Sequence, residues 1–145
     1  MITTRKISAA GRNKEAGSAL LEGSLTLLVF LLLIIAICDF GQFLFIHQTI
    51  TERVRGALRY GSVNPYDPTP VRNMVLYGNP APPEGATPAF DMTADMVSVS
   101  RQDAGTQEDR LVVTVANYHY KFLTPYIAGS LSGLTISNTL TYEYQ

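Results

Sequence analysis

The longest apolar segment of the chain lies near its N-terminus and predicts a helix that crosses a membrane. Every residue from Leu25 to Cys38 is apolar except Thr26, and apolar residues resume after Asp39. About 20 apolar residues of α-helix span the roughly 30 Å of hydrocarbon in a bilayer, and residues 23–46 supply them. A buried core helix is a poorer interpretation, because the rest of so short a chain has too little surface to cover so many leucines.

Beyond Asp39 the apolar positions recur with helical spacing, so we expect the helix to continue as an amphipathic stem as far as residue 60. These positions are Phe40, Phe43, Leu44, Thr51, Val54 and Leu58. His47 falls on the apolar side of this stem. We interpret it as a packed or interfacial histidine rather than a metal ligand, since His119 is the only other histidine.

Residues 61–94 contain seven of the eight prolines and predict a connecting loop. Within this loop, residues 71–79 favour one or two helical turns closed by Gly78. The stretch 79–90 favours extended or polyproline conformation. A proline-rich motif that binds a partner is the sharper alternative, but no basic residue accompanies a PxxP pattern there.

The C-terminal residues 95–145 alternate between apolar and polar residues and predict three strands. We expect them at 95–102, 110–122 and 134–144, with a turn at Gly105 between the first two. An antiparallel sheet with one face covered by the stem helix follows from this order. The fold class is therefore α+β, with a long N-terminal transmembrane and stem helix followed by a small antiparallel sheet.

Alternation also predicts which side chains of the sheet point toward its core. On the last strand we expect one apolar face, made of Leu134, Ile136, Leu140, Tyr142 and Tyr144. We interpret Tyr118, Tyr120, Tyr142 and Tyr144 as cross-strand aromatic pairs. A platform that stacks a ligand is the alternative reading of these tyrosines.

Composition and charge remove several classes of function. The 145 residues carry a formal net charge of -1, so no basic surface for nucleic acid is expected. The chain shows no phosphate loop, nucleophile elbow or spaced metal ligands, and we expect neither an enzyme nor a bound cofactor or metal. The single cysteine, Cys38, lies within the apolar segment and is interpreted as a lipid-facing or packed side chain.

Basic residues before the apolar segment predict its orientation. Arg5, Lys6, Arg12 and Lys14 outweigh Glu15, which places the N-terminus in the cytoplasm and the rest of the chain outside it. A secretory signal cut near residues 36–38, or a lipoprotein signal ending at Cys38, fits poorly. The apolar segment continues past that point, and Ile37 is bulky for the position before a lipidated cysteine.

A third kind of export segment is cut before its apolar run, and residues 15–24 have the matching pattern. Gly17 ends a short basic leader, Ser18 follows it, and Glu22 would be the fifth residue of the cut chain. Together with the acidic residue and glycine after the apolar run, the arginine-bearing end of the stem and the C-terminal strands, this pattern resembles the TadE-like family. These are pseudopilins or minor pilins of tight-adherence (Flp) pili, a type IV pilus system.

The resemblance implies a processing event and an assembly contact. The dedicated prepilin peptidase would cut between Gly17 and Ser18, and the formal side-chain charge would change from -1 to -4. Glu22 would then meet the new N-terminal ammonium of a neighbouring subunit. The plainer alternative is that Glu22 marks the start of the span at headgroup level. Asp39 lies 17 residues later, about 26 Å along a helix, and is interpreted as a carboxylate at the outer membrane interface.

The resemblance also implies partners and location. It predicts a single-pass protein of the bacterial inner membrane with a periplasmic head, which supports assembly or initiation of pili used in attachment and biofilm formation. Its partners would be the prepilin peptidase, other pseudopilins, the major pilin and the inner-membrane assembly platform. The alternative of another class is an uncleaved, membrane-anchored periplasmic binding or scaffold module that never enters a pilus. The expected segments are a leader at 1–17, a helix at 18–60, a loop at 61–94 and a sheet at 95–145.

Overall fold

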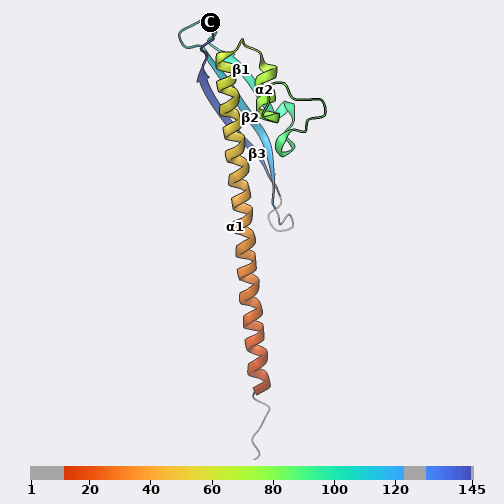
Figure 1. Ribbon diagram of the computed structural model, residues 1–145. Helices are drawn as coiled ribbons and strands as arrows, with labels where there is room; N and C mark the ends of the chain where they lie inside the picture. Colours follow the sequence, from red (N-terminus) through yellow and green to blue (C-terminus); the bar gives the residue numbers. More distant parts are fainter. Residues whose placement is uncertain (1–11, 123–129, 145) are drawn as a thin grey trace, which may run out of the picture. The chain divides into compact units, whose positions relative to one another are not determined.

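The computed structural model describes residues 12–122 and 130–144, and it contains one very long helix, a short helix and a three-stranded sheet (Figure 1). Helix α1 runs Arg12–Val63 and α2 runs Pro68–Tyr77. Two single 3₁₀ turns, η1 (Ala89–Asp91) and η2 (Ala94–Met96), precede the sheet. The strands are β1 (Val97–Gln102), β2 (Arg110–Lys121) and β3 (Ser130–Thr141). The predicted α+β class is confirmed.

The chain forms two compact units, residues 1–40 and 41–145, and each is described by itself. The first contains the N-terminal part of α1. Most of its predicted leader, residues 1–11, lies outside the described residues. The second unit contains the rest of α1, helix α2 and the sheet, and we call it the head.

The sheet of the head is antiparallel in the order β1-β2-β3, so that the longest pairing joins β2 to β3. The pairing register shifts twice. Between Val115 and Tyr118, β2 carries one extra residue, and Asn117 there has a left-handed φ of 57°. Between Tyr118 and Tyr120 of β2, the extra residue is instead on β3, where Gly133 has φ 80°. These two bulges let both strands continue pairing after a local change of phase.

The first bulge changes which side chains of β2 reach the core. Leu111, Val113 and Val115 alternate on the buried face, whereas beyond Asn117 the buried residues are Tyr118 and Tyr120. Without the extra residue the two tyrosines would point to the opposite face, because side chains in a strand alternate with period two. The bulge therefore joins an aliphatic and an aromatic segment into one continuous face.

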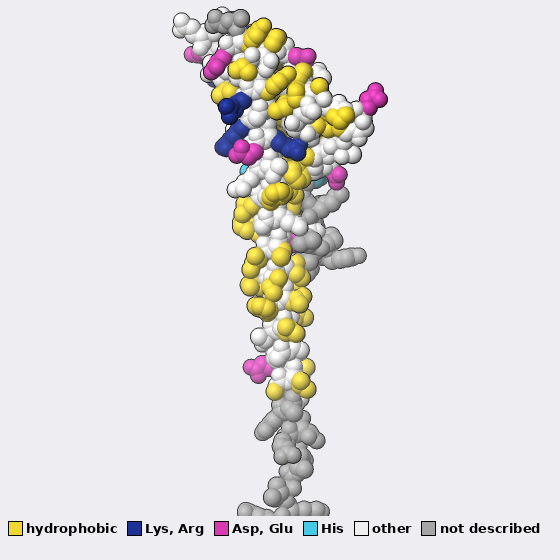
Figure 2. Space-filling view, in the orientation of Figure 1, with side chains coloured by type: hydrophobic (Ala, Val, Ile, Leu, Met, Phe, Trp, Pro, Cys, Tyr) yellow, Lys and Arg dark blue, Asp and Glu magenta, His cyan; other side chains and the backbone are white. Residues whose placement is uncertain are grey.

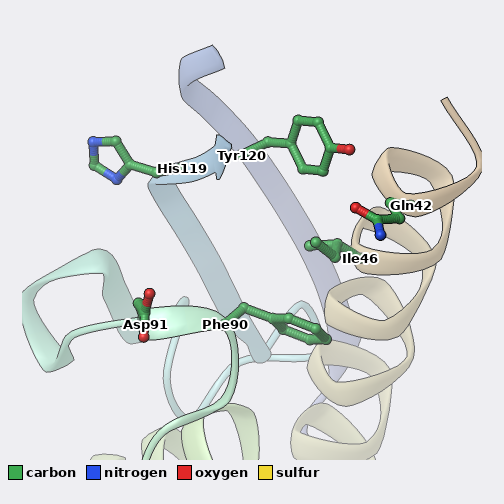
Figure 3. Close-up of a pocket in the computed structure, with 6 residues that line it drawn as sticks. All are labelled: Gln42, Ile46, Phe90, Asp91, His119 and Tyr120. Atoms are coloured by element: carbon green, nitrogen blue, oxygen red, sulfur yellow. The ribbon is translucent and has the colours of Figure 1, made fainter. Parts of the chain in front are cut away.

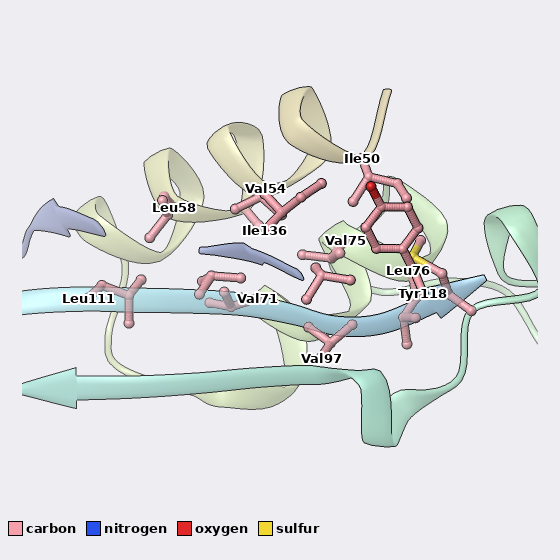
Figure 4. Close-up of a cluster of buried hydrophobic side chains, with 14 residues drawn as sticks. Ile50, Val54, Leu58, Val71, Val75, Leu76, Val97, Leu111, Tyr118 and Ile136 are labelled. Atoms are coloured by element: carbon pink, nitrogen blue, oxygen red, sulfur yellow. The ribbon is translucent and has the colours of Figure 1, made fainter. Parts of the chain in front are cut away.

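The hydrophobic core lies between this face and the two helices (Figure 4). Helix α1 contributes Ile50, Val54, Ala57 and Leu58, and α2 contributes Val71, Val75 and Leu76. The prediction for the stem was only partly right. Val54 and Leu58 are buried as expected, but Phe40 and Leu44 are exposed, and Ile50 was not among the predicted positions.

Helix α2 confirms the expected helical turns within the proline-rich segment and is longer than expected. The Asp67 carboxylate accepts a hydrogen bond from the Thr69 amide, and Pro68 occupies the first helical position, where its missing N–H is no loss. Gly78, at φ 71°, closes the helix as predicted. The Arg53 side chain donates from Nη1 to the carbonyls of Val75 and Leu76. Arg53 thus ties the end of α2 to α1.

The shared face predicted for the last strand agrees with the register of β3, since Leu140 stands opposite the buried Leu111. Leu140 is still 38% exposed, and Tyr144, which lies beyond the end of β3, is 46% exposed. The prediction that the tyrosines pair across strands is wrong. Tyr118 stands opposite Leu134, and Tyr120 stands opposite Leu131.

A partly buried ion pair lies at the end of the head where β1 turns into β2. The Asp109 carboxylate accepts hydrogen bonds from Nε and Nη2 of Arg101 and from the Gly105 amide. The Arg101 guanidinium lies over the Tyr142 ring, 3.9 Å from its centroid. These contacts hold the pKa of Asp109 at about 2, below its ordinary value, chiefly through the Arg101 hydrogen bonds.

The close approach of α1 to the sheet predicts the effect of enlarging Gly61. A Cβ at this position would lie 2.5 Å from Leu111 Cδ2 and 2.8 Å from Val71 Cγ2. We expect Gly61→Ala to lower the free energy of unfolding of the head by about 1–3 kcal/mol, because overpacking a core forces side chains off their rotamers. Urea unfolding of the detergent-solubilised chain, followed by near-ultraviolet tyrosine circular dichroism, measures this change.

The matched control is Gly56→Ala, because this glycine is also helical but has no atom within 4 Å of an added Cβ. It should leave the stability unchanged or raise it by up to about 1 kcal/mol through better helix propensity. Equal behaviour of the two variants would contradict the close packing at Gly61.

The low pKa of Asp109 predicts how its contribution to stability depends on pH. Because the folded pKa of about 2 lies below the unfolded value, folding favours the ionised carboxylate. This contribution is complete above pH of about 4 and is lost as the pH falls toward 2. Asp109→Asn should therefore lower the urea midpoint of unfolding at pH 7. The difference in urea midpoint between this variant and the unmodified chain should shrink as the pH falls from 4 to 2.

Asp103→Asn is the control, since this residue pairs with Arg110 at an exposed position. Exposed ion pairs contribute little to stability. The urea midpoint of Asp103→Asn at pH 7 should therefore stay close to that of the unmodified chain. A pH-independent loss in Asp109→Asn would show that the carboxylate charge does not stabilise the head.

Candidate functional site

The N-terminal part of α1 presents apolar side chains on all sides. Large hydrophobic residues from Leu20 to Ile37 are exposed, Leu20 to 75% and Leu32 to 42%, and Figure 2 shows hydrophobic side chains along this stretch of the helix. Among the described residues one helix is long and apolar enough to cross a membrane, with a mean hydropathy of 2.6 over its most apolar window, of which none is buried. An apolar surface of this extent requires a lipid or protein environment.

The predicted processing residues lie inside this helix. Helix α1 begins at Arg12, so Gly17 and Ser18 are both helical, and both are exposed. No atom lies within 4 Å of the position that a Cβ on Gly17 would occupy. Glycine weakens a helix by about 1 kcal/mol relative to alanine. The peptide bond between the two residues is therefore accessible and lies in a locally weak part of the helix.

Glu22 also lies on α1 and is exposed. Its backbone carbonyl accepts a hydrogen bond from the Thr26 hydroxyl at 2.9 Å, while Ser24 donates in the same way to Leu21. These bonds satisfy two polar side chains locally, as an apolar environment requires. A shallow groove runs beside the Glu22 carboxylate, and its lining residues are Ala19, Glu22, Gly23, Thr26, Leu27 and Phe30.

Asp39 differs from Glu22 in its surroundings. It is 5% exposed and has a polar interaction partner. A buried and partnered carboxylate is stable next to an apolar segment, whereas an isolated one is costly there. The proposed place of Asp39 at the outer membrane interface remains a prediction.

His47 is packed against the sheet, as the sequence indicated. Its Nδ1 forms a hydrogen bond of 2.7 Å with the Tyr118 hydroxyl, and its ring stacks with Phe43 at a centroid distance of 6.1 Å. Burial raises the pKa of the Tyr118 phenol. No group of three potential metal ligands occurs among the residues that the structure describes. The contacts with Tyr118 and Phe43 pack His47 between α1 and the aromatic part of the sheet.

The structure also contains a cavity that the sequence did not indicate (Figure 3). It has a volume of about 320 Å³, and its lining residues are Gln42, Ile46, Phe90, Asp91, His119 and Tyr120. They come from α1, from η1 and from the end of β2. Phe90 and Asp91 both have left-handed backbones, with φ 55° and 53°. This conformation costs about 1–2 kcal/mol for a residue with a side chain; here it packs Phe90 on the core and leaves Asp91 exposed.

Helix α1 is exposed around Gly17 and Glu22 and continues into the α+β head. This arrangement has a counterpart among protein families. Residues 17–59 match the model of the TadE-like protein family. The resemblance predicted from the sequence is confirmed over these residues. Over these residues the chain is similar to a family related to tight-adherence pili, and the same stretch contains the helix that is long and apolar enough to cross a membrane. No curated protein and no solved structure matches the chain.

The match to the TadE-like family includes all four residues singled out in the sequence, namely Gly17, Ser18, Glu22 and Asp39. It ends within the stem of α1 and so covers neither α2 nor the sheet. The cavity therefore combines residues of the matched part, Gln42 and Ile46, with residues beyond it.

Proposed function

We propose that the chain is a pseudopilin that supports assembly or initiation of tight-adherence pili after removal of a leader. In this proposal the prepilin peptidase cuts between Gly17 and Ser18, and the cut protein remains in the inner membrane through α1. Its C-terminal head faces the periplasm, and its membrane helix packs against other pseudopilins, the major pilin or the assembly platform.

The observation that carries this proposal is the family match over residues 17–59, which includes the expected cut and Glu22. Exposure of Gly17 and Ser18 supports access by a peptidase. The apolar surface of α1 supports a working contact inside the bilayer. Since lipid gives no hydrophobic drive to helix association, such contacts depend on close packing at small residues and on polar interactions.

Glu22 supplies the polar interaction. A carboxylate beside the hydrocarbon costs about 2–4 kcal/mol when it has no partner, and the part of the structure that is described gives its side chain none. After the cut, Glu22 would lie about one turn from a new α-ammonium, near the positive end of the helix dipole. Pairing with the ammonium of a neighbouring subunit removes the cost and sets the register of the two helices.

The contrasting candidate is a membrane-anchored scaffold or binding module that keeps its leader. The cavity in the head is the observation that favours it, because a binding module needs a concave site. The two candidates differ in the state of the N-terminus and in the effect of Glu22 on piliation.

Leader removal is tested by intact mass and N-terminal sequencing of the protein purified from membranes, with and without an active prepilin peptidase. We expect a chain that starts at Ser18 only when the peptidase is active, and a full-length chain otherwise. The full-length chain in both strains would reject processing and favour the anchored module. A lipid attached to Cys38 would reject both readings of the N-terminus.

The role of Glu22 is tested by Glu22→Ala in cells that assemble pili. We expect surface pili to be lost, because incoming subunits lack the ionic contact, while the variant is still inserted and cut. Glu52→Ala is the control, since Glu52 is an exposed acidic residue of α1 whose only described pair is a surface contact with Arg55 at 3.3 Å. Normal piliation in Glu22→Ala, with the protein present in the membrane, would contradict an assembly role.

A further inference from the structure

The sheet of the head has two outer edges, and the edge on β3 is open. Strand β2 is paired on both sides, whereas β1 and β3 are each paired on one side. Within the described residues, no hydrogen bond from outside the sheet reaches the backbone of residues 133–141. An open edge presents N–H and C=O groups with which a further strand can pair. The sheet can therefore be extended beyond β3.

The pairing with β2 shows which backbone groups of β3 point outward. The Tyr142 amide donates to the Asp109 carbonyl at 2.9 Å, so these two residues form a hydrogen-bonded pair next to the ladder. Hydrogen-bonded and non-hydrogen-bonded pairs alternate along antiparallel strands. Ser137, Thr139 and Thr141 therefore belong to non-hydrogen-bonded pairs, and their N–H and C=O groups point away from β2.

Strand β3 lacks the features that usually protect an edge. Its 12 residues contain no charged residue and no proline, whereas natural edge strands are commonly blunted by charges, by proline or by short length. The bulge at Gly133 lies before the regular stretch. Leu140 stands opposite the buried Leu111, on the core side of the sheet, and is nevertheless exposed. A further strand beside β3 would cover this leucine.

The edges on β1 and β3 belong to different sides of the head. Helix α2 packs on β1, and Arg53 of α1 binds the end of α2. Because an α-helix turns by about 100° per residue, Arg55 and Arg59 project from the side of α1 that faces away from α2. Ser62 lies two turns beyond Arg55 on this side, and its carbonyl binds the amides of the two residues that follow Tyr142. The side with Arg55 and Arg59 is therefore the β3 side of the head.

These two sides of the head differ in charge. Arg55 and Arg59 are both exposed. Arg55 shares a surface ion pair with Glu52, whereas within the described residues the Arg59 guanidinium forms none. Figure 2 shows basic side chains gathered on the stem. The segment 79–96, which follows α2, has no basic residue and three exposed acidic ones, Glu84, Asp91 and Asp95. Opposite charges favour contact between the β3 side of one head and the α2 side of another.

We propose that a second copy of the chain adds its strand β1 to the β3 edge, so that the sheets of neighbouring heads become continuous. The side of α1 that carries Arg55 and Arg59 then meets the acidic segment 79–96 of the second copy, and Leu140 is covered. This inference rests on membrane anchoring through α1. It is independent of leader removal and of the contact proposed for Glu22.

The orientation of anchored copies fits this pairing. Strands β1 and β3 both run antiparallel to β2, so they are parallel to each other. Copies anchored through α1 in one membrane share one orientation, and β1 of one copy is then parallel to β3 of the next. By the same alternation along β2, Val99 and Arg101 of β1 point backbone groups outward. The contact joins two different surfaces, so it can repeat from copy to copy.

The test is disulfide formation in membranes between two differently tagged full-length copies, both with Cys38→Ser. One copy carries Thr139→Cys on β3, and the other carries Ser98→Cys or Ser100→Cys on β1, at positions that are all exposed. Mild oxidation should give a disulfide-linked dimer of the two tagged copies, because neighbouring strands lie about 4.8 Å apart, within the Cα separation that a disulfide spans. The prepilin peptidase is absent from the strain, so that the result does not depend on leader removal.

The matched control is Thr139→Cys in both copies. It should give at most about a tenth as much dimer, because cysteines whose Cα atoms are more than about 7 Å apart are not bridged. As much dimer from this control as from the combination of β3 with β1 would overturn the proposal in favour of contact between like edges. Absence of dimer from both β1 cysteines would overturn it as well.

A second pair of variants tests whether the backbone of the edge makes the contact. Ser137→Pro removes an outward N–H without touching the ladder with β2, whereas Ser137→Ala keeps this N–H. Both variants lose the same hydroxyl contact with Thr114. In the copy with Thr139→Cys, we expect Ser137→Pro to lower the yield of dimer about fivefold, as the loss of one hydrogen bond allows, and Ser137→Ala to leave it unchanged.

Near-ultraviolet circular dichroism of the tyrosines verifies that the head of each Ser137 variant is folded. Equal yields of dimer from the folded proline and alanine variants would overturn pairing through the edge of β3.

Discussion

One helix has to satisfy two different environments, and this constraint organises the whole molecule. From Leu20 to Ile37 the large side chains of α1 are almost all apolar, and they are exposed all round, as a lipid environment requires. From Ile46 onward one stripe of the same helix, including Ile50, Val54 and Leu58, is packed on the sheet, while Glu52, Arg55 and Arg59 face water. The stem part of α1 thus supplies one wall of the core of the head.

The sequence was informative where composition or a single residue decides the structure. The membrane segment needs only a run of apolar residues, and the end of α2 needs only Gly78, whose left-handed φ favours glycine. The three strands follow from alternation, and Val54 and Leu58 from helical spacing. These features are local, so a single sequence contains what is needed to predict them.

The predictions that were wrong or missing concern features that one sequence does not determine locally. Five of the seven residues 40–46 of α1 are large and apolar, so spacing does not distinguish the packed side from the exposed one there. Phe40 and Leu44 were therefore misassigned. Ile50, which is buried, was also missed. The bulge at Asn117 changes the phase of β2 through one backbone angle, and neither it nor the left-handed turn at Phe90 has a sequence signal strong enough to predict. The cavity depends on both places and could not be foreseen. Of the candidate site, Gly17, Ser18, Glu22 and Asp39 were singled out from the sequence. The grouping of residues around the cavity was not.

The last residues of the chain are tied to the end of α1. The Ser62 carbonyl accepts hydrogen bonds from the amides of Glu143 and Tyr144, at 3.0 and 2.9 Å, and the Tyr142 hydroxyl donates to the Asn64 carbonyl at 3.0 Å. A pulling force applied near the C-terminus therefore reaches the long helix directly, before it loads the pairing between β2 and β3. In a protein anchored at one end, this connection gives the head a mechanical route to the membrane that bypasses its sheet.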